Sequence, residues 1–189
     1  MTSKEYILNK IDKKSREEVS LPQMKLFEDN QYNLLKTFTN ECISIGASVV
    51  DVKAGNHIPN VLKTLNSKVP IVDLVNKFDL DFSTNEVVDD LYGQDVVFAE
   101  GEYGIAENGG IWLDTTKMIH RGLLFSCERL VLLINRKNII LNMNILYDRI
   151  GSYDYDFGVL IAGPSKTADI EQSLVIGAQG AKELIVIIE

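Results

Sequence analysis

The stretch VLIAGPSKTAD, residues 159–169, joins an apolar run to a glycine-proline turn and then to a polar segment. The apolar residues at its start are typical of a buried strand. Gly163 and Pro164 predict a turn, and residues 167–176 have a pattern that predicts a helix. This unit, a strand followed by a loop and a helix, is the building block of α/β proteins.

The rest of the chain alternates in the same way between apolar runs of strand length and segments with helical spacing. The predicted strands are residues 47–52, 69–75, 96–99, 130–134, 157–162 and 184–188. The predicted helices are residues 4–14, 24–45, 56–65, 84–91, 142–150 and 167–176. This order predicts a mostly parallel sheet with helices on both faces and right-handed crossovers.

Two features modify this simple alternation. Asn108-Gly109 lies between apolar residues within the segment 103–114, and this pair is a strong signal for a tight β-hairpin of type I′. We therefore expect an antiparallel insertion there. The start of the chain, residues 1–45, is expected to be a helical part of the same single α/β domain, which would cover residues 1–189.

Composition excludes several classes of function. The 19 basic and 27 acidic residues give a net charge of −8, and no basic cluster is long enough to follow a phosphate backbone, so nucleic acid is not an expected partner. No apolar stretch reaches the length of a signal peptide or a membrane span, which predicts a soluble cytoplasmic protein that does not bind membranes.

The histidines and cysteines do not form a recognisable metal or cluster site. Cys42 and Cys127 are far apart and belong to no Cys-x-x-Cys pair, so we expect buried, reduced thiols. His57 and His120 are equally separated and have no carboxylate at metal-ligand spacing. No metal and no cofactor held by this chain are expected.

The loop after the strand at residues 157–162 is the strongest candidate for a ligand site. Strand ends are the usual ligand positions in open α/β sheets, and a helix capped by Thr167 would offer unpaired N–H groups to a carboxylate or phosphate. The candidate ligand-binding residues are Gly163, Ser165, Lys166, Thr167, Ala168 and Asp169. In the alternative interpretation the helix start is only capped, and Asp169 and Glu171 compensate the helix dipole.

The string Ala162-Gly163-Pro164-Ser165-Lys166-Thr167-Ala168-Asp169-Ile170-Glu171 closely resembles the C-terminal signature of the lactate-utilisation (LUD) domain family, of the LutC/YkgG type. The resemblance continues through Leu174-Val175-Ile176-Gly177, Gly180 and Lys182-Glu183-Leu184. Upstream it is looser, through Tyr92-Gly93, the run Gly104-Ile105-Ala106-Glu107 and Ser152. Residues 84–189 are the best-matching region, and the N-terminal helices add little.

This resemblance implies a fold similar to the superfamily of NagB, RpiA and the CoA transferases. It also implies a role as an accessory protein or subunit in the oxidation of L-lactate to pyruvate. With two cysteines, the chain could not hold the clusters that such electron transfer requires, so iron-sulfur partner subunits are expected. The stretch between residues 135 and 152 is shorter than in longer family members, so a pocket wall supplied there is expected to be missing.

Two further residues are candidates for chemistry. Glu107-Asn108-Gly109 resembles a CoA-transferase motif whose glutamate is the nucleophile, which would make the chain an acyl or CoA transferase. The hairpin turn explains the same three residues without catalysis. His120 is a weak candidate for a general base or an anion contact. A third interpretation is a small-molecule-binding module without chemistry.

Overall fold

The structure is a computed structural model, and it describes residues 2–12, 33–52, 58–65, 71–75, 77–78, 95–116, 118, 120–151, 156–170, 173–177 and 180–189. The predicted helix at residues 84–91 and the first part of the one at residues 24–45 lie outside these ranges. Among the described helices, none combines the length and the apolar character needed to cross a membrane.

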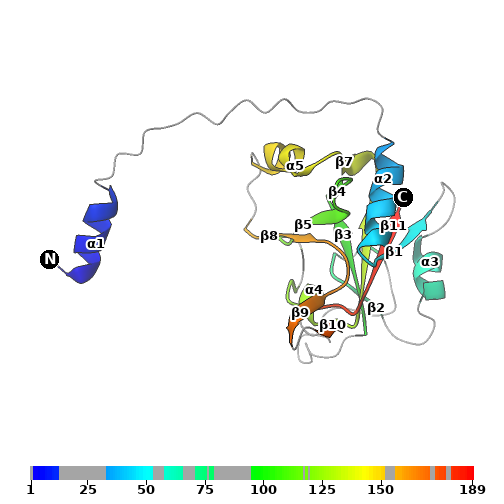
Figure 1. The fold of residues 1–189 in the computed structure, drawn as a ribbon. Helices are drawn as coiled ribbons and strands as arrows, with labels where there is room; N and C mark the ends of the chain where they lie inside the picture. Colours follow the sequence, from blue (N-terminus) through cyan, green and yellow to red (C-terminus); the bar gives the residue numbers. More distant parts are fainter. Residues whose placement is uncertain are drawn as a thin grey trace.

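A five-stranded parallel sheet forms the centre of the fold (Figure 1), in the strand order β1-β11-β6-β3-β2. Its strands are β1 (Ser48–Asp51), β2 (Ile71–Asp73), β3 (Val96–Gly101), β6 (Arg129–Ile134) and β11 (Glu183–Ile188). Each of them was predicted from a short run of β-branched and other apolar residues. The central strands β6 and β11 pair along six residues, from Glu183↔Arg129 to Ile188↔Ile134.

Helices cover both faces of this sheet, as the alternating pattern predicted. On one face, α2 (Leu34–Ser44) and α4 (Leu123–Ser126) pack on the core that contains Leu132 and Val186. On the other face, α3 (Ile58–Leu65) contributes Leu62 to a second core with Phe98. Successive residues of each strand point alternately to the two faces, so a parallel strand covered on both sides must be apolar throughout.

The predicted hairpin is part of a second sheet with the strand order β7-β4-β5-β8. Its strands are β4 (Tyr103–Ile105), β5 (Gly110–Asp114), β7 (Ile139–Ile140) and β8 (Gly158–Ile161). β4 and β5 are antiparallel, but Ile105 pairs with Gly110, so the loop is residues 106–109 and not a two-residue type I′ turn. Gly109, with φ of +67°, donates its N–H to the carbonyl of Ile105.

The second sheet lies between two layers. Ile111 and Leu113 of β5 face the core shared with the parallel sheet, while Trp112 points the other way. There it packs with Leu146 and Ile150 of α5 (Met143–Ile150), the helix predicted at residues 142–150. The short 3-10 helix η1 (Arg136–Asn138) connects β6 to β7.

One predicted helix is wrong. Residues 167–176 form two strands, β9 (Lys166–Ile170) and β10 (Ser173–Ile176), which pair antiparallel as a separate two-stranded sheet. The apolar residues at the end of this segment are Leu174, Val175 and Ile176, a consecutive run with β-branched members that suits a strand. Gly177, with φ of +78°, ends the second strand.

The two N-terminal helices were both predicted. α1 (Ser3–Asp12) corresponds to the amphipathic segment at residues 4–14. α2 ends where Gly46, with φ of +96°, follows its last turn, which is the arrangement expected for a glycine after a helix C-terminus. Phe38 and Cys42 are buried on one face of α2.

Candidate functional site

The loop Gly163–Lys166 packs against the C-terminal end of α2, which is far away in the sequence. Gly163 has φ of +73°, and a Cβ at this position would lie 2.8 Å from the carbonyl oxygen of Ile45. Lys166 Nζ donates to the same carbonyl oxygen at 2.6 Å. A cation at this place also interacts favourably with the negative end of the α2 dipole. The loop therefore depends on a glycine at residue 163 for its close approach to α2.

Hydrogen bonds of Ser165 fasten the loop to the residues that precede β11. The Ser165 N–H donates to Ala181 O at 2.8 Å, and the Gly177 N–H donates to Ser165 O at 3.0 Å. The base of the β9-β10 hairpin is thus fixed by backbone pairing. Thr167 lies in β9 and caps no helix, so the predicted cradle of helix N-terminal N–H groups does not exist.

A cavity of about 660 Å³ opens beside this loop, and we call it the amino-edge cavity. It is lined by Ser44, Ile45, Leu124, Leu130, Leu160, Ile161, Ala162, Gly163, Pro164, Ser165, Lys166, Gly180, Ala181 and Leu184. Three of the predicted ligand-binding residues, Gly163, Ser165 and Lys166, are therefore in its wall. Ala168 and Asp169 belong to β9 with Thr167, and the structure describes only their backbone.

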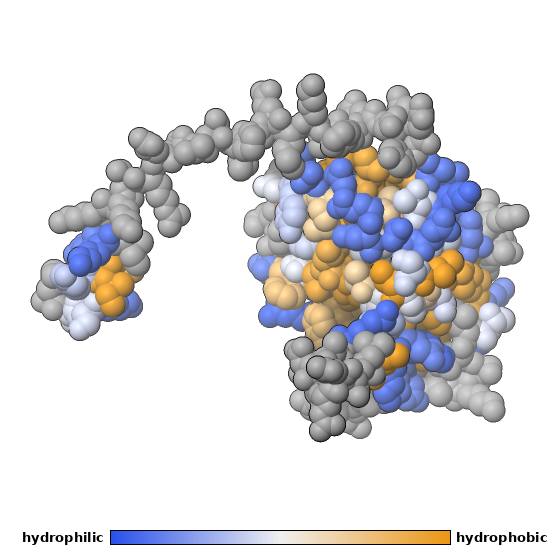
Figure 2. Space-filling view, in the orientation of Figure 1, coloured by the Kyte–Doolittle hydropathy of each residue, from blue (hydrophilic) through white to orange (hydrophobic). Residues whose placement is uncertain are grey.

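The position of this cavity differs from the one expected for an open α/β sheet. Leu130 and Leu184 lie near the start of β6 and β11, so the cavity is at the amino ends of the parallel strands. The reason is that β8, the strand before the loop, belongs to the second sheet and pairs with β5. Figure 2 shows hydrophobic residues at the surface in the middle of the face seen in Figure 1, with hydrophilic residues above them.

Glu107 is held at the start of α5. Its Oε1 accepts the Met143 N–H at 2.7 Å, and its own N–H donates to Leu141 O at 3.0 Å. Met143 is the first residue of α5, where backbone N–H groups have no partner within the helix. Glu107 therefore has a structural task, and it lines neither this cavity nor the one described below.

This arrangement predicts a structural effect of Glu107 variants. We expect Glu107→Gln, which keeps an acceptor for the Met143 N–H, to lower stability by less than about 1 kcal/mol. Glu107→Ala should cost about 1 kcal/mol more, as the loss of a helix cap does. Neither should change a measured activity more than a few-fold. Loss of activity by several orders of magnitude in a folded Glu107→Gln protein would instead favour an acyl or CoA transferase in which Glu107 is the nucleophile.

His120 is half-buried, between β5 and α4. Its Nδ1 is buried and has no hydrogen-bond partner among the described residues. It lines neither cavity, so the structure does not bring it together with Gly163, Lys166 or Glu107. Among the described residues, no group of three His, Cys, Asp or Glu side chains is placed to hold a metal ion.

Both cysteines are buried and unpaired, as predicted. Burial, which disfavours the thiolate, raises the pKa of Cys42 to about 12 and that of Cys127 to about 11, from the ordinary 9.0. Since the thiolate is the reactive form, neither residue is suited to be a nucleophile near neutral pH.

These raised pKa values predict how stability depends on pH. The unfolded chain releases the two protons near pH 9.0, whereas the folded chain keeps them up to about pH 11 and 12. Below pH 9.0 both states keep the protons, and the free energy of unfolding is at its full value. Above pH 9.0 the unfolded chain loses them first, which lowers the free energy of unfolding by about 1 kcal/mol for each thiol at about pH 10. Urea denaturation of wild type and of Cys42→Ala/Cys127→Ala between about pH 8 and 10 tests this. If the free energy of unfolding falls with pH equally in wild type and in the double variant, the thiols do not cause the pH dependence.

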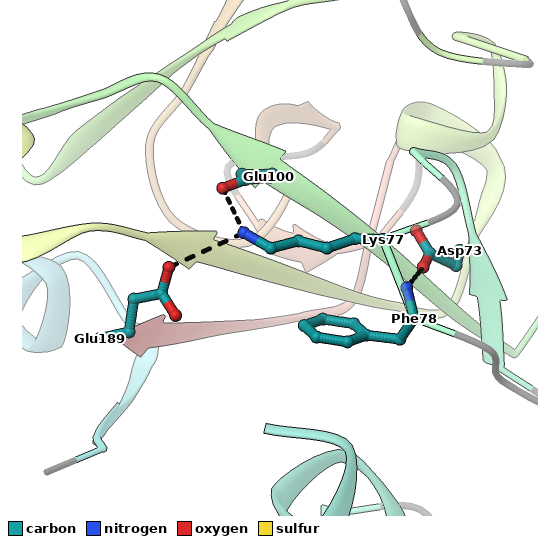
Figure 3. A network of polar contacts seen from close by, with 5 residues as sticks. All are labelled: Asp73, Lys77, Phe78, Glu100 and Glu189. Atoms are coloured by element: carbon teal, nitrogen blue, oxygen red, sulfur yellow. Dashed lines mark hydrogen bonds and ion pairs between the residues drawn. The ribbon is translucent and has the colours of Figure 1, made fainter. Parts of the chain in front are cut away.

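A second polar region, which the sequence patterns did not indicate, lies at the carboxyl ends of the parallel strands (Figure 3). Lys77 Nζ lies 2.5 Å from Glu100 Oε1 and 3.7 Å from Glu189 Oε1. The buried carboxylate of Asp73 accepts the N–H groups of Val75 and Phe78 at 3.0 and 2.9 Å, which fixes the turn after β2.

A cavity of about 480 Å³ adjoins this region, and we call it the carboxyl-edge cavity. It is lined by Val75, Glu100, Gly101, Glu102, Tyr103, Asp114 and Asn138. Three of these side chains are carboxylates, and the ammonium of Lys77 already pairs with one of them. A negative ligand would be repelled here, so the amino-edge cavity suits an anion better.

These features define a mixed α/β protein with a parallel central sheet, a second sheet and a cavity beside its Gly-Pro-Ser-Lys loop. The LUD domain model matches residues 1–188, so the chain belongs to the LUD domain family. The match includes the N-terminal part as well as the region that carries the sequence resemblance. Family membership supports a role related to lactate utilisation.

The fold is also similar to the crystal structure of a DUF162 family protein from Deinococcus radiodurans. The TM-score is 0.63 and the sequence identity 16%, over 82% of this chain and 95% of that chain. At this identity the likeness shows the shared fold only. No curated protein sequence matches the chain.

Proposed function

We propose that this chain is a LutC-like accessory protein or subunit of L-lactate utilisation that binds a small anionic ligand in the amino-edge cavity. The observation that carries the proposal is the place of the LUD signature motif. Gly163, Pro164, Ser165 and Lys166 of that motif all line the cavity. Lys166 is the one charged side chain among the described residues of the lining, in a chain whose net charge is −8.

The lining favours binding over catalysis. Among the described residues of the cavity wall there is no His, Cys, Asp or Glu. Of the other groups there that could take part in chemistry, the Ser44 hydroxyl and the Lys166 ammonium donate to the carbonyl oxygens of Glu41 and Ile45. Glu107, the residue that an acyl or CoA transferase would use, is engaged with the start of α5. We therefore favour a non-catalytic binding role within the pathway.

The redox step is assigned to partner proteins. Oxidation of lactate to pyruvate releases two electrons, which iron-sulfur clusters can carry, and such clusters are held mainly by cysteine thiolates. The two cysteines of this chain are buried, in separate elements, with raised pKa values. Iron-sulfur subunits that bind this chain are the expected partners, in the cytoplasm.

A growth experiment tests the pathway role. We expect deletion of the gene to slow growth on L-lactate as the sole carbon source, with growth on glucose unchanged. Complementation by wild type should restore growth, and an affinity-tagged chain should co-purify with proteins that show iron-sulfur absorbance. Normal growth on lactate without the gene would refute the proposal.

The anion site makes a separate prediction for Lys166. Lys166→Met should weaken the binding of lactate, pyruvate or phosphate about ten- to a hundredfold, because a charge-assisted hydrogen bond contributes about 1.5–3 kcal/mol. Lys137→Met is the matched control, since Lys137 is an exposed lysine of η1 that does not line the cavity. Calorimetric titration measures the affinity of each variant for these anions. Unchanged affinity in Lys166→Met would place the anion elsewhere.

A further inference from the structure

We propose that the amino-edge cavity receives an extended acidic segment of a partner protein, which pairs as an added strand with the free edge of β8. This inference rests on the proposed anion site and adds that the anion is a carboxylate side chain of that segment. It gives a place of contact to the partner subunits that the pathway role requires.

β8 is an edge strand with one open side. It is the last strand in the order β7-β4-β5-β8 and pairs with β5. The Thr115 N–H donates to the opposite residue, at Phe157 O, and bonded and non-bonded pairs alternate along an antiparallel ladder. The N–H groups of Gly158, Leu160 and Ala162 therefore point away from β5. Among the described residues these three N–H groups have no backbone acceptor.

This edge lacks the features that usually prevent the addition of a strand. Edge strands are commonly shielded by charged residues, by proline or by being very short. β7 and β2 have two and three residues, and Asp51 at the end of β1 forms an ion pair with Arg136. Residues 157–163, which contain β8, include neither a charged residue nor a proline. The described part of β8 is thus open to pairing with a further strand.

The open side of β8 borders the amino-edge cavity. Leu160 and Ala162, whose N–H groups point away from β5, both line it, together with Leu124 of α4. In Figure 1 β8 lies between β5 and α4. The Leu160 side chain packs with Trp112, on the face of the second sheet that is turned away from the shared core. β8 therefore presents mainly backbone to the cavity, and a strand that enters can bond to it.

Lys166 determines the charge of the added segment. The described lining of the cavity contains no acidic residue. Lys166 Nζ donates to Ile45 O at 2.6 Å, and an ammonium group has two further donors. A Glu or Asp side chain on a strand beside β8 can accept a charge-assisted hydrogen bond from Lys166, which still contacts α2. The complementary segment is therefore acidic.

A single segment suits this place better than β8 of a second copy of the chain. A second copy would bring its own β5 beside its β8, whereas the cavity beyond this edge is bounded by Leu124, Leu130 and Leu184. Two copies that each carry a net charge of −8 also repel one another. The four residues of β8 span about 13 Å, at about 3.3 Å per residue, so a short extended segment is sufficient.

The probe is an acetylated and amidated synthetic peptide, Thr-Val-Thr-Glu-Thr-Val, titrated into the full chain by calorimetry. Replacement of its Glu by Gln should weaken binding at least about tenfold, because the charge-assisted hydrogen bond is lost. Two further forms carry N-methyl groups on alternate amides, one form for each edge of the peptide. One form should bind at least about tenfold more weakly, and the other should bind like the parent, since an added strand pairs through one edge.

Two variants of Ala162 connect binding to β8. Ala162→Pro should weaken the Glu peptide about tenfold, because it removes an N–H of the free edge and places a ring there. Ala162→Val keeps the N–H and should change the affinity less than about twofold. Ala162 is exposed, so both variants are expected to fold, which circular dichroism checks. In Lys166→Met, the Glu and Gln peptides should bind equally.

The outcomes separate this inference from the proposed function. If acetate binds as tightly as the Glu peptide and both depend on Lys166, the anion site stands and the added strand is refuted. If both Ala162 variants bind the peptide equally, or both methylated forms bind like the parent, the peptide does not pair with β8 and the inference is refuted.

The edge also has a competing occupant, which light scattering detects. A dimer that Ala162→Pro dissociates and Ala162→Val does not would show that a second copy occupies β8, which refutes the partner segment. If neither acetate nor the peptide binds below millimolar concentration, the ligand part of both proposals falls. Growth on lactate then still tests the pathway role independently.

Discussion

Replacement of Gly163 by valine is expected to lower the free energy of unfolding by about 3 kcal/mol. Two causes add together. Gly163 has φ of +73°, a conformation that is costly for any residue with a Cβ and most costly for a β-branched one. A Cβ would also lie 2.8 Å from the carbonyl oxygen of Ile45, so the loop would have to move away from α2. Urea denaturation followed by circular dichroism measures the change.

Gly122→Val is the control for this prediction. Gly122 precedes α4 with φ of −63°, a value that valine can adopt, and it is exposed. This variant should cost less than about 1 kcal/mol. Equal effects of the two substitutions would show that the positive φ of Gly163 is not what the loop requires. Lys166→Met removes a charge from the same loop without backbone strain, so it should affect binding more than stability.

Most of the fold was predictable because its signals are local. β6 and β11 are short runs of apolar residues with polar residues on either side, which fixes them as buried strands wherever they lie in the sheet. α2 has its apolar residues at helical spacing and a glycine after its last turn. Such patterns depend only on a residue and its near neighbours, so one sequence is enough to detect them.

The segment 167–176 shows where a local pattern is insufficient. Ile170 and Leu174 are four residues apart, which is helical spacing, and Thr167 is a good helix cap. Pairing between the two halves of the segment decides for strands and against a helix. Ile176 lies opposite Lys166, and Val175 lies opposite Thr167. The β-branched residues Ile170, Val175 and Ile176 were the available signal for strands, and they carried more information than the capping residue.

The sequence pointed to the loop that adjoins the amino-edge cavity, but not to what surrounds that loop. Gly163 and Lys166 were identified from their motif, whereas the contact of Lys166 with Ile45 joins positions 121 residues apart, for which no local pattern exists. The ion pairs of Lys77 were missed although a signal was present. Glu100 and Glu189 each lie at the carboxyl end of a parallel strand, and such ends meet at one edge of a sheet.

Phe38→Ala is expected to have the largest effect on stability, about 3–5 kcal/mol. Phe38 is fully buried on α2 and belongs to the core between the helix and the parallel sheet. Its ring also lies against Gly104 of β4, where a Cβ would be 3.1 Å from the ring. One side chain thus connects α2 to both sheets. The adjoining backbone of β4 is paired on both sides, with β5 and β7, and cannot move in to fill the space.

Ile43→Ala, on the same helix, is the control that isolates burial from helix propensity. Ile43 is 57% exposed, so its truncation removes little buried surface, and alanine is the better helix former. We expect a change within about 0.5 kcal/mol. Since α2 also provides Ser44 and Ile45 to the amino-edge cavity, Phe38→Ala should loosen that wall and weaken ligand binding, whereas Ile43→Ala should not. If both variants unfold at the same urea concentration, α2 is not anchored through Phe38, and the cavity would need another support.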